Sequence, residues 1–243
     1  MEVKELYKDY LTTHFSTGHK IRIDKKTYER YFRYFKLNYE NYLPKNKNAR
    51  IVDLGCGIGH FLFYLKKSNY TNFIGVDLGK QAVEFCKKHK LAPKIIFSDA
   101  YSFLKKSKEK YDVIIFNDII EHIPKKDMIP LLKLMKNRLS KKGILIIKTP
   151  NCSNPITAGS SRYIDFTHTV GFTEESLSQV LKLEEFKRIK ILKQNIFVFN
   201  PLINLVGHII QGILNSIMYL LFLIYGRKTT KIFTKDIIAI AYN

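Results

Sequence analysis

The chain has 243 residues, enough to bury the core of one large domain, or of a domain with an appendage, without disulfide bonds. With 46% hydrophobic and 26% charged residues, its composition is typical of a globular protein and excludes a disordered, collagen-like or low-complexity chain. The formal net charge of +20 suits an anionic partner (nucleic acid, anionic lipid or a phosphorylated substrate) or a solvated lysine-rich surface without a specific partner.

Cysteine usage and the first residues bear on the cellular compartment. Cys56, Cys86 and Cys152 form no CxxC pair and no even framework, which indicates a reducing cytosol rather than a secreted disulfide scaffold. The opening MEVKELYKDY contains no apolar run. We therefore expect a cytoplasmic protein without a signal peptide.

Residues 1–48 are polar and rich in aromatic side chains. Between residues 25 and 43 the aromatic residues recur at spacings of three and four, which predicts an amphipathic helix. Pro44 and the polar run after it end this pattern. We interpret residues 1–48 as an N-terminal helical cap and residues 49–243 as the main domain.

From residue 50 onward, short apolar runs alternate with helical stretches. Strands are predicted at 51–54, 73–76, 95–97, 113–116 and 144–147, and helices at 58–67, 79–90, 100–107 and 127–139. Asp127 is the expected N-cap of the last helix. Several strand runs lack polar alternation, as do strands of a parallel sheet covered on both faces. The pattern predicts a Rossmann-like, doubly wound α/β fold.

The C-terminal part begins with a long polar segment at 150–172, and a loop of this length in a compact domain is usually functional or disordered. A helix follows, with Thr173 as its N-cap and with Phe172 and Leu177 as a hydrophobic staple. A strand at 186–193, an apolar helix at 202–225 and a strand at 236–242 bring the expected sheet to seven mostly parallel strands.

The most informative motif is the run IVDLGCGIGHF, which begins at Ile51. A buried strand leads into glycines 55, 57 and 59, which permit positive φ angles and a close approach of a ligand to the backbone. The spacing is GxGxG, not the GxGxxG of dinucleotide folds. Acidic residues lie at the ends of the first three strands, where carboxylates accept hydrogen bonds from ribose hydroxyls: Asp53, Asp77 and Asp99.

The motifs VDLGCGIGHF, GVDLG, SDA and FNDIIEH resemble those of class I S-adenosylmethionine (SAM) methyltransferases across about residues 50–150. The resemblance implies that SAM is the cofactor and that the glycine loop packs against its methionine part. It also implies that Asp53 approaches the SAM amino group, Asp77 the ribose and Asp99 the adenine. The other residues that it places at the cofactor are Gly55, Cys56, Gly57, Gly59, Leu78, Ala100, Asn117 and Asp118, with the last two beside the sulfonium. The alternatives are a domain that binds another nucleotide and a SAM fold without activity.

Two histidines are candidates for the base that removes a proton from a hydroxyl acceptor. His122 follows the fourth strand and His168 lies after the fifth, so both lie at the sheet edge where α/β folds bind ligands. Asp165 either orients His168 as the base or only binds it within the loop, and His122 alternatively serves packing or a helix start. Arg162 either binds a phosphate or carboxylate of the substrate or is solvated.

A metal site formed by Asp118, Glu121 and His122 is conceivable. Because no other clustered ligand pattern supports it, we expect no metal.

A narrower resemblance covers about residues 120–180. The runs EHIPKKD, KTPNCSNP and RYIDFTHTVGFTEESL look like those of methyltransferases from surface-polysaccharide gene clusters. This resemblance implies O-methylation of a sugar or a phosphorylated precursor in capsule or lipopolysaccharide biosynthesis. The motif NPPY, expected for methylation of DNA adenine or protein glutamine, is absent.

The apolar segment 202–225 is about 36 Å long as a helix, enough to cross a bilayer. Polar residues form a stripe along it, however, and the last strand follows it. We therefore interpret residues 201–228 as an insertion that packs on the domain, forms a homodimer or lies in a membrane interface. Arg227, Lys228 and Lys231 suit anionic headgroups, which places the protein in the cytoplasm or on the inner membrane face.

The leading hypothesis is a cytoplasmic SAM-dependent O-methyltransferase whose partner is a small-molecule or saccharide substrate, with or without a phosphate. A methyltransferase of RNA, or of another small molecule, is the second hypothesis, which the net charge alone favours. The third is a non-catalytic SAM-fold partner associated with a membrane through residues 202–225. The intact set of acidic residues argues against the third.

Overall fold

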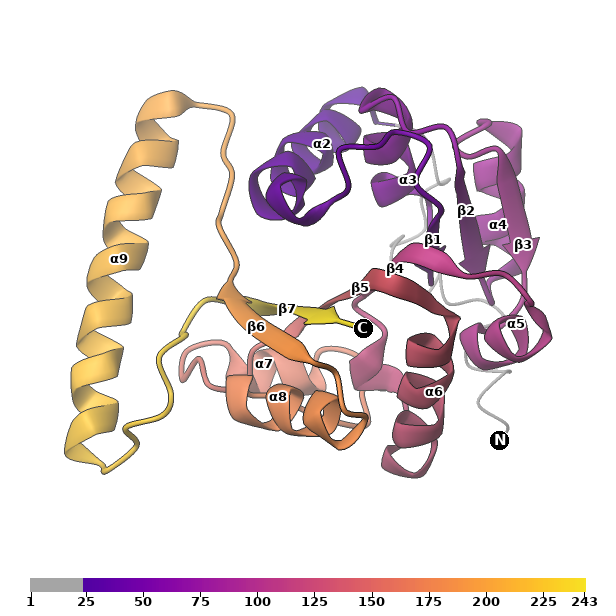
Figure 1. The fold of residues 1–243 in the computed structure, drawn as a ribbon. Coiled ribbons are helices and arrows are strands. Elements are labelled where there is room, and N and C mark those ends of the chain that lie inside the picture. Colours follow the sequence, from indigo (N-terminus) through magenta and orange to yellow (C-terminus); the bar gives the residue numbers. More distant parts are fainter. Residues whose placement is uncertain (1–23) are drawn as a thin grey trace.

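The computed structural model describes residues 24–243 as a seven-stranded sheet flanked by helices (Figure 1). Its strands are β1 (Ile51–Leu54), β2 (Phe73–Asp77), β3 (Lys94–Phe97), β4 (Tyr111–Asn117), β5 (Leu139–Pro150), β6 (Arg188–Lys193) and β7 (Asp236–Tyr242). They lie in the order β3-β2-β1-β4-β5-β7-β6. β1 to β5 pair in parallel, whereas β7 is antiparallel to both of its neighbours. The predicted Rossmann-like fold with a mostly parallel sheet is therefore confirmed.

The helices alternate with the strands as far as β5. They are α2 (Lys25–Tyr39), α3 (His60–Lys67), α4 (Lys80–Lys88), α5 (Ala100–Lys106), α6 (Lys125–Arg138), α7 (Ala158–Tyr163), α8 (Glu174–Leu183) and α9 (Pro201–Ile224), with short 3-10 turns η2 (Glu40–Tyr42) and η3 (Ile120–His122). α2 and α3 cover one face of the sheet, and α6, α7 and α8 cover the other (Figure 1). The sheet therefore lies between two helical layers.

Two apolar clusters fill the space between the sheet and its helices. In β4, Val113 and Ile115 belong to one cluster, while Ile114 and Phe116 belong to the other. This alternation follows from the two-residue period of a strand, because successive side chains point to opposite faces. All four side chains are buried, which explains why the sequence of this strand has no polar alternation.

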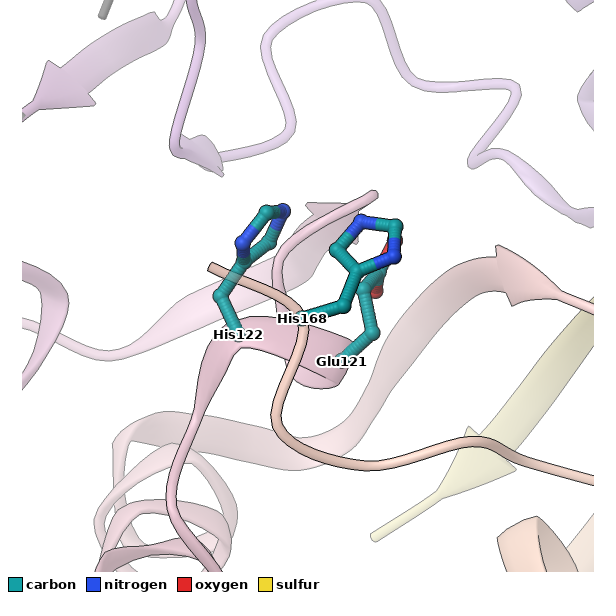
Figure 2. Close-up of side chains that lie close together, drawn as sticks. All are labelled: Glu121, His122 and His168. Carbon is teal, nitrogen blue, oxygen red and sulfur yellow. The ribbon is translucent and has the colours of Figure 1, made fainter. Parts of the chain in front are cut away.

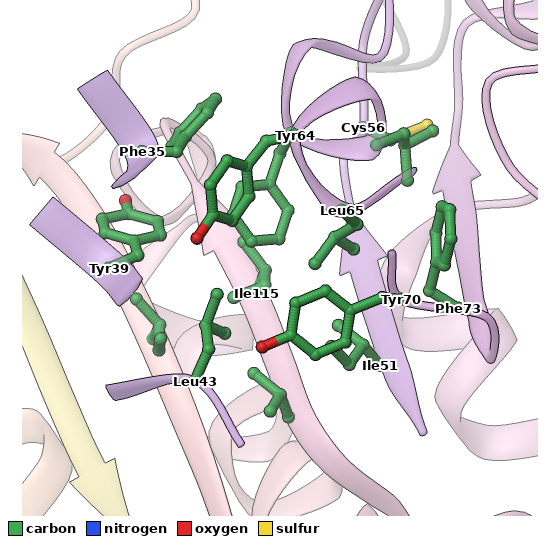
Figure 3. Packing of buried hydrophobic residues seen from close by; sticks show 14 of the residues in the cluster. Phe35, Tyr39, Leu43, Ile51, Cys56, Tyr64, Leu65, Tyr70, Phe73 and Ile115 are labelled. Atoms are coloured by element: carbon green, nitrogen blue, oxygen red, sulfur yellow. The ribbon is translucent and has the colours of Figure 1, made fainter. Parts of the chain in front are cut away.

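The described part of the N-terminal cap shares the core of the main domain. Asp24 caps α2 through hydrogen bonds from the backbone N–H groups of residues 26 and 27. The Phe35 ring packs edge-to-face on the Phe61 ring of α3, with ring centroids 4.9 Å apart. Tyr39 is fully buried in the apolar cluster that also contains side chains of β1 and β4 (Figure 3). α2 is thus held by the core of the sheet, while residues 1–23 of the predicted cap lie outside the described residues.

Two local predictions were wrong. Helix α6 begins at Lys125, with Pro124 as its N-cap residue and Asp127 inside the first turn. Proline suits the start of a helix because it has no N–H and its φ is fixed near the helical value. The segment 150–172 is not loop throughout, since it contains α7 and a bridge between Asn151 and Phe172.

The helix start at Thr173 is confirmed. The Thr173 side chain accepts a hydrogen bond from the Ser176 N–H, and the Ser176 hydroxyl reaches back to the Thr173 N–H, which makes a capping box. Phe172 and Leu177 are both buried in one apolar cluster. This helix start also fixes the end of the segment that carries His168.

Helix α9 stands beside the domain (Figure 1). None of its residues is buried, but its less exposed side touches the rest of the chain, where the Phe222 ring packs edge-to-face on buried Phe233 with ring centroids 4.7 Å apart. Packing on the domain, dimer formation and membrane contact therefore all stay predictions for this insertion. The predicted polar stripe is its least exposed side; Asn204, for example, accepts a hydrogen bond from the Val198 N–H. Within residues 24–243, α9 is the only helix long and apolar enough to cross a membrane.

Candidate cofactor and acceptor site

A cavity of about 960 Å³ lies at the carboxyl ends of β1, β2, β4 and β5. Ligands of open α/β sheets bind at this edge, at the point where the strand order reverses. The cavity is lined by all the residues that the first resemblance places at the cofactor except Gly59, and by both candidate base histidines and Asp165. Residues separated by more than a hundred positions in the chain thus share one space.

The glycine loop forms one wall of the cavity. Gly55, Gly57 and Gly59 have φ angles of +76°, +50° and +81°, which L side chains rarely adopt. A Cβ atom on Gly55 would also collide with the Ile119 side chain, whereas one on Gly57 would meet nothing within 4 Å. The first glycine is therefore required by space as well as by φ, and the second by φ alone.

Two carboxylates hold or face this loop. Asp77 accepts hydrogen bonds from the N–H groups of Gly57 and Gly79, both at 2.7 Å, and so ties the end of β2 to the loop. Asp53 is 2% exposed, and burial together with the nearby Asp77 charge raises the pKa of Asp53 to about 8. Both side chains line the cavity. A cationic ligand beside them would stabilise the charged form of Asp53.

The third acid, Asp99, lies at the far end of the same wall. It is the N-cap of α5 and accepts a hydrogen bond from the Ser102 N–H at 2.8 Å. Ala100 and Leu78 line the cavity beside it. The three acids therefore follow one another along the ends of β1, β2 and β3, in the order that the resemblance implies.

The end of β4 carries an ion pair that the sequence did not predict. Asp118 adopts a positive φ of +54°. One oxygen of its carboxylate forms an ion pair with Lys148 Nζ of β5 at 2.5 Å. Burial opposes the charge of Lys148, but Asp118 and other nearby groups raise the pKa of this lysine above its ordinary value. Asn117 accepts a hydrogen bond from the Tyr39 hydroxyl at 2.6 Å, which links the cap to β4. A lysine inside the apolar run ILIIKTP was the available sequence signal.

The two histidines meet at the opposite wall (Figure 2). Their ring centroids are 4.6 Å apart at an interplanar angle of 72°. The Nδ1 atom of His122 lies 2.7 Å from the Thr167 hydroxyl, and that of His168 lies 2.9 Å from the Ser161 carbonyl oxygen. Burial, aided by His168, lowers the pKa of His122 to about 4, so this imidazole is neutral at pH 7.

Glu121 lies behind the His168 ring in the view of Figure 2 and was expected only as part of an unfavoured metal site. Its side chain is buried, and one carboxylate oxygen accepts a hydrogen bond from the Thr149 hydroxyl at 3.1 Å. Burial and the neighbouring Asp118 raise the pKa of Glu121 well above its usual value. The ligand atoms of Glu121, His122 and His168 all lie within 4.8 Å of one another.

Two side chains of the 161–169 segment make hydrogen bonds within it, where the His168 N–H also donates to the Asp165 carbonyl oxygen at 3.2 Å. The Asp165 carboxylate accepts hydrogen bonds from the N–H and hydroxyl of Thr167, so it supports His122 through Thr167. Arg162 donates to the carbonyls of His168 and Thr169. Arg162 is not among the described residues that line the cavity. Its guanidinium therefore shapes the segment around His168.

Aromatic side chains of the cap cover the cavity. Tyr31 and Phe35 of α2 line it. The Tyr31 ring stacks on the His60 ring, with ring centroids 3.9 Å apart. His60 Nε2 is buried without a hydrogen-bond partner among the described residues, and burial lowers the pKa of His60 to about 4. The sequence predicted this amphipathic helix but contained no signal for where its aromatic face would dock.

Comparison with known proteins places this arrangement in a family. A family model for a methyltransferase domain matches residues 27–190, from α2 to β6. The chain belongs to the methyltransferase domain family.

Curated relatives of this methyltransferase match part of its length. It is 33% identical over 107 residues to the ubiquinone biosynthesis O-methyltransferase of Pelagibacter ubique, with 43% of each chain covered. It is 34% identical over 121 residues to polyamine aminopropyltransferase 2 of Aquifex aeolicus, covering 44% of this chain and 24% of that protein. The methyltransferase thus spans less than half the length of these two relatives.

Solved structures of similar fold cover nearly all of the methyltransferase. A SAM-dependent methyltransferase from Archaeoglobus fulgidus has a TM-score of 0.63 at 22% identity, with 91% of this chain and 100% of that chain covered. Magnesium protoporphyrin IX methyltransferase from Synechocystis, with bound SAM, has a TM-score of 0.55 at 14% identity and coverages of 100% and 98%. At these identities the similarity shows the fold alone.

SAM is the cofactor of this methyltransferase, and the described residues fit it. The sulfonium and amino group of SAM are cationic, and the cavity wall offers the carboxylates of Asp53 and Asp77. The glycine loop leaves open space at Gly57, where a side chain would intrude. The same cavity extends to the two histidines.

Proposed function

We propose that this SAM-dependent methyltransferase methylates a hydroxyl group of a small saccharide, or of a phosphorylated precursor, used to build a surface polysaccharide. The observation that carries the proposal is the pair His122 and His168, which faces the same cavity as the three acids at the strand ends. A hydroxyl acceptor has to lose a proton during methylation, and an imidazole beside it can assist that loss. The O-methyl transfer named for the Pelagibacter relative supports this choice.

Residues of the first wall hold the cofactor in this proposal. Asp53 binds the amino group, the loop from Gly55 to Gly59 packs on the methionine part, and Asp77 accepts hydrogen bonds from the ribose. Asp99 and Ala100 bind the adenine, Leu78 packs beside the ribose, and Asn117 and Asp118 border the sulfonium. When bound, SAM supplies a methyl group whose carbon bonds to the acceptor oxygen as its bond to sulfur breaks, the electron pair staying on sulfur. The protein aligns the acceptor, since alignment supplies much of the rate for an activated donor.

The acceptor wall suits a sugar. Aromatic rings of Tyr31 and Phe35 provide a flat apolar surface, while Asn117, Ser160 and Asp165 provide polar atoms in the same cavity. Lys235 also lines the cavity, and together with the net charge of +20 it favours an acceptor that carries a phosphate. RNA is the competing acceptor, and it differs in requiring many phosphate contacts and a steep salt dependence.

A methyl-transfer screen tests the proposal. Wild-type protein and labelled SAM are incubated with sugar nucleotides, sugar phosphates and a structured RNA, and the methylated product is identified by mass spectrometry. We expect an O-methyl sugar, with turnover lowered by roughly 10²–10⁴ in both His122→Ala and His168→Ala. His208→Ala, on α9, is the matched control and should keep full turnover. Methylation of RNA alone, or of an amine, would contradict the proposal.

We further propose that α9 lies in the interface of an anionic bilayer. Its outward face carries exposed aliphatic side chains along its whole length, among them Leu205, Ile209, Ile213 and Ile217. No charged residue occurs between Pro201 and Gly226, and Arg227 and Lys228 follow at once. Apolar area together with flanking basic residues is the combination that binds anionic lipid surfaces. Such a location brings the site to lipid-linked or membrane-proximal acceptors at the cytoplasmic face.

Vesicle sedimentation tests the bilayer contact. We expect binding to vesicles of phosphatidylcholine mixed with phosphatidylglycerol, weaker binding to phosphatidylcholine alone, and loss of binding in Ile209→Ser/Ile213→Ser. Leu183→Ser, at an exposed apolar position of α8, is the matched control. A stable dimer by light scattering that does not sediment with either vesicle would contradict this proposal.

A further inference from the structure

The acceptor wall combines three side chains that commonly bind metal ions. Glu121 and His122 come from η3, and His168 comes from the segment between α7 and α8. Figure 2 shows the two rings and the carboxylate gathered at one place, and their ligand atoms lie within 4.8 Å of one another. Two atoms that are each about 2.1 Å from one ion lie at most about 4.2 Å apart, so closure of less than an ångström suffices.

Hydrogen bonds behind the rings fix how the two imidazoles face the cavity. The Ser161 carbonyl can only accept, so His168 Nδ1 carries the hydrogen and Nε2 carries the lone pair. The Thr167 hydroxyl donates its hydrogen to Asp165 at 2.7 Å, so it accepts from His122 Nδ1. His122 therefore also has its lone pair on Nε2. Metal-binding histidines are typically oriented in this way by an acceptor behind the ring.

Glu121 adds a carboxylate beside these two lone pairs. Its side chain is 2% exposed, and the Thr149 hydroxyl orients one of its oxygens. None of the ion pairs among the described residues involves Glu121. A buried carboxylate next to two nitrogen lone pairs is costly unless a cation compensates it. A single base would need one lone pair, whereas this arrangement directs three donors to one place.

We propose that Glu121, His122 and His168 bind one divalent first-row transition-metal ion such as Mn²⁺, Fe²⁺, Co²⁺ or Zn²⁺. Two imidazoles and one carboxylate favour these ions over Mg²⁺ and Ca²⁺, which prefer oxygen ligands. The inference rests on the proposed methylation of a hydroxyl, because that hydroxyl is the ligand that completes the coordination. With the ion bound, neither histidine removes the proton directly, because a lone pair bound to a metal cannot accept a proton.

The bound ion would activate the acceptor. Coordination lowers the pKa of a hydroxyl or water, so the acceptor loses its proton to solvent and its oxygen keeps the electron pair. That pair forms the new bond to the methyl carbon, and the pair of the broken carbon–sulfur bond stays on sulfur. The ion is neither oxidised nor reduced.

Cobalt titration tests the site without a methyl acceptor. Protein treated with a chelator and dialysed is titrated with Co²⁺, and the visible absorption of the bound ion is followed. We expect one ion per chain in the wild type and in His208→Ala. His122→Ala, His168→Ala and Glu121→Gln should each weaken Co²⁺ affinity at least about 100-fold, and Thr167→Val about 10- to 100-fold, because it removes the support behind His122.

Two further measurements separate this inference from the proposed function. Calorimetry with SAM shows that each variant is folded, and turnover is compared before and after chelation. Wild type without a stoichiometric Co²⁺ band, or with hydroxyl methylation unchanged after chelation, overturns the metal site while leaving the proposed function intact. Stoichiometric Co²⁺ binding that depends on the three ligands, with no hydroxyl methylated in the screen, overturns the proposed function and supports the metal site.

Discussion

The cavity has a cofactor half and an acceptor half, and the two differ in the sequence separation of the segments that form them. The cofactor half consists of Asp53, the loop Gly55–Gly59, Asp77 and Asp99, each at or just beyond the end of a strand. The acceptor half combines α2, η3, the end of β5 and residues 157–168. The first half depends on backbone geometry that short motifs encode, whereas the second depends on how distant segments pack. Substitutions in the two halves should therefore have separable effects.

Gly55→Val should have the largest effect, and it should fall on the cofactor half. The substitution places a branched side chain at a φ of +76° and against Ile119. We expect SAM affinity to fall by more than about 100-fold, with a loss of about 1–3 kcal/mol in the free energy of unfolding. Calorimetry and chemical denaturation measure the two effects. Gly212→Ala, in open space on α9, is the control and should leave SAM affinity unchanged.

Lys148→Met should destabilise the protein at the boundary of the two halves, because Lys148 belongs to the end of β5 and its partner Asp118 follows β4. The Lys148 side chain is 13% exposed and that of its partner Asp118 is 50% exposed, so water compensates part of the lost ion pair. We expect a loss of about 1–3 kcal/mol in the free energy of unfolding, below the cost for a fully buried pair. The second substitution Asp118→Asn should recover part of this loss in a double-mutant cycle. Additive effects of the two substitutions would show that the pair does not contribute.

SAM affinity should depend on pH through Asp53. Burial and Asp77 raise the pKa of Asp53 to about 8, so the free protein carries a proton there at pH 7. A cationic amino group favours the ionised form, so SAM binding releases this proton and affinity rises between about pH 6 and 8, by at most tenfold per pH unit. Calorimetry in buffers of different ionisation enthalpy measures the proton release. In Asp53→Asn the rise should disappear, and a rise that persists would exclude Asp53 as its source.

Tyr39→Phe should have the smallest effect, and it tests whether the cap supports the site. The substitution removes the hydrogen bond to Asn117 and should cost about 0.5–1.5 kcal/mol of stability with a few-fold loss of SAM affinity. Tyr70→Phe is the matched control, because Tyr70 donates to the Pro44 carbonyl away from the cavity. Equal stability losses with equal SAM affinities would show that the cap only stabilises the fold.

The sequence was sufficient for most of the fold and for grouping the predicted cofactor residues, which all line one cavity except Gly59, while their individual roles stay predictions. Apolar strand runs, the glycine spacing and the acids at strand ends are local signals, and β1 and β7 begin and end where the sequence predicted. The acceptor half was predicted less completely. Both histidines were found because they follow strands. The contacts of Lys148 with Asp118 and of Glu121 with the two histidines were not predicted, because they depend on tertiary packing.

The position of α9 shows a second limit of sequence patterns. Its length and apolar composition were read correctly, yet the helix leaves its apolar face uncovered. The polar stripe turned out to be the side nearer the domain, which the sequence alone did not indicate. The spacing of apolar residues predicts which side of a helix is apolar, but it does not predict whether that side contacts the protein, a partner or a membrane.

The most direct test of the division between the halves is calorimetric titration of SAM into wild type, Asp77→Asn and His168→Ala. Asp77 accepts hydrogen bonds from the N–H of Gly57 in the glycine loop and from the N–H of Gly79, whereas His168 contacts Ser161 and the His122 ring on the opposite wall. The predicted result is a loss of SAM affinity of at least about tenfold in Asp77→Asn and wild-type affinity in His168→Ala. Wild-type affinity in Asp77→Asn together with lost affinity in His168→Ala would contradict the placement of the cofactor.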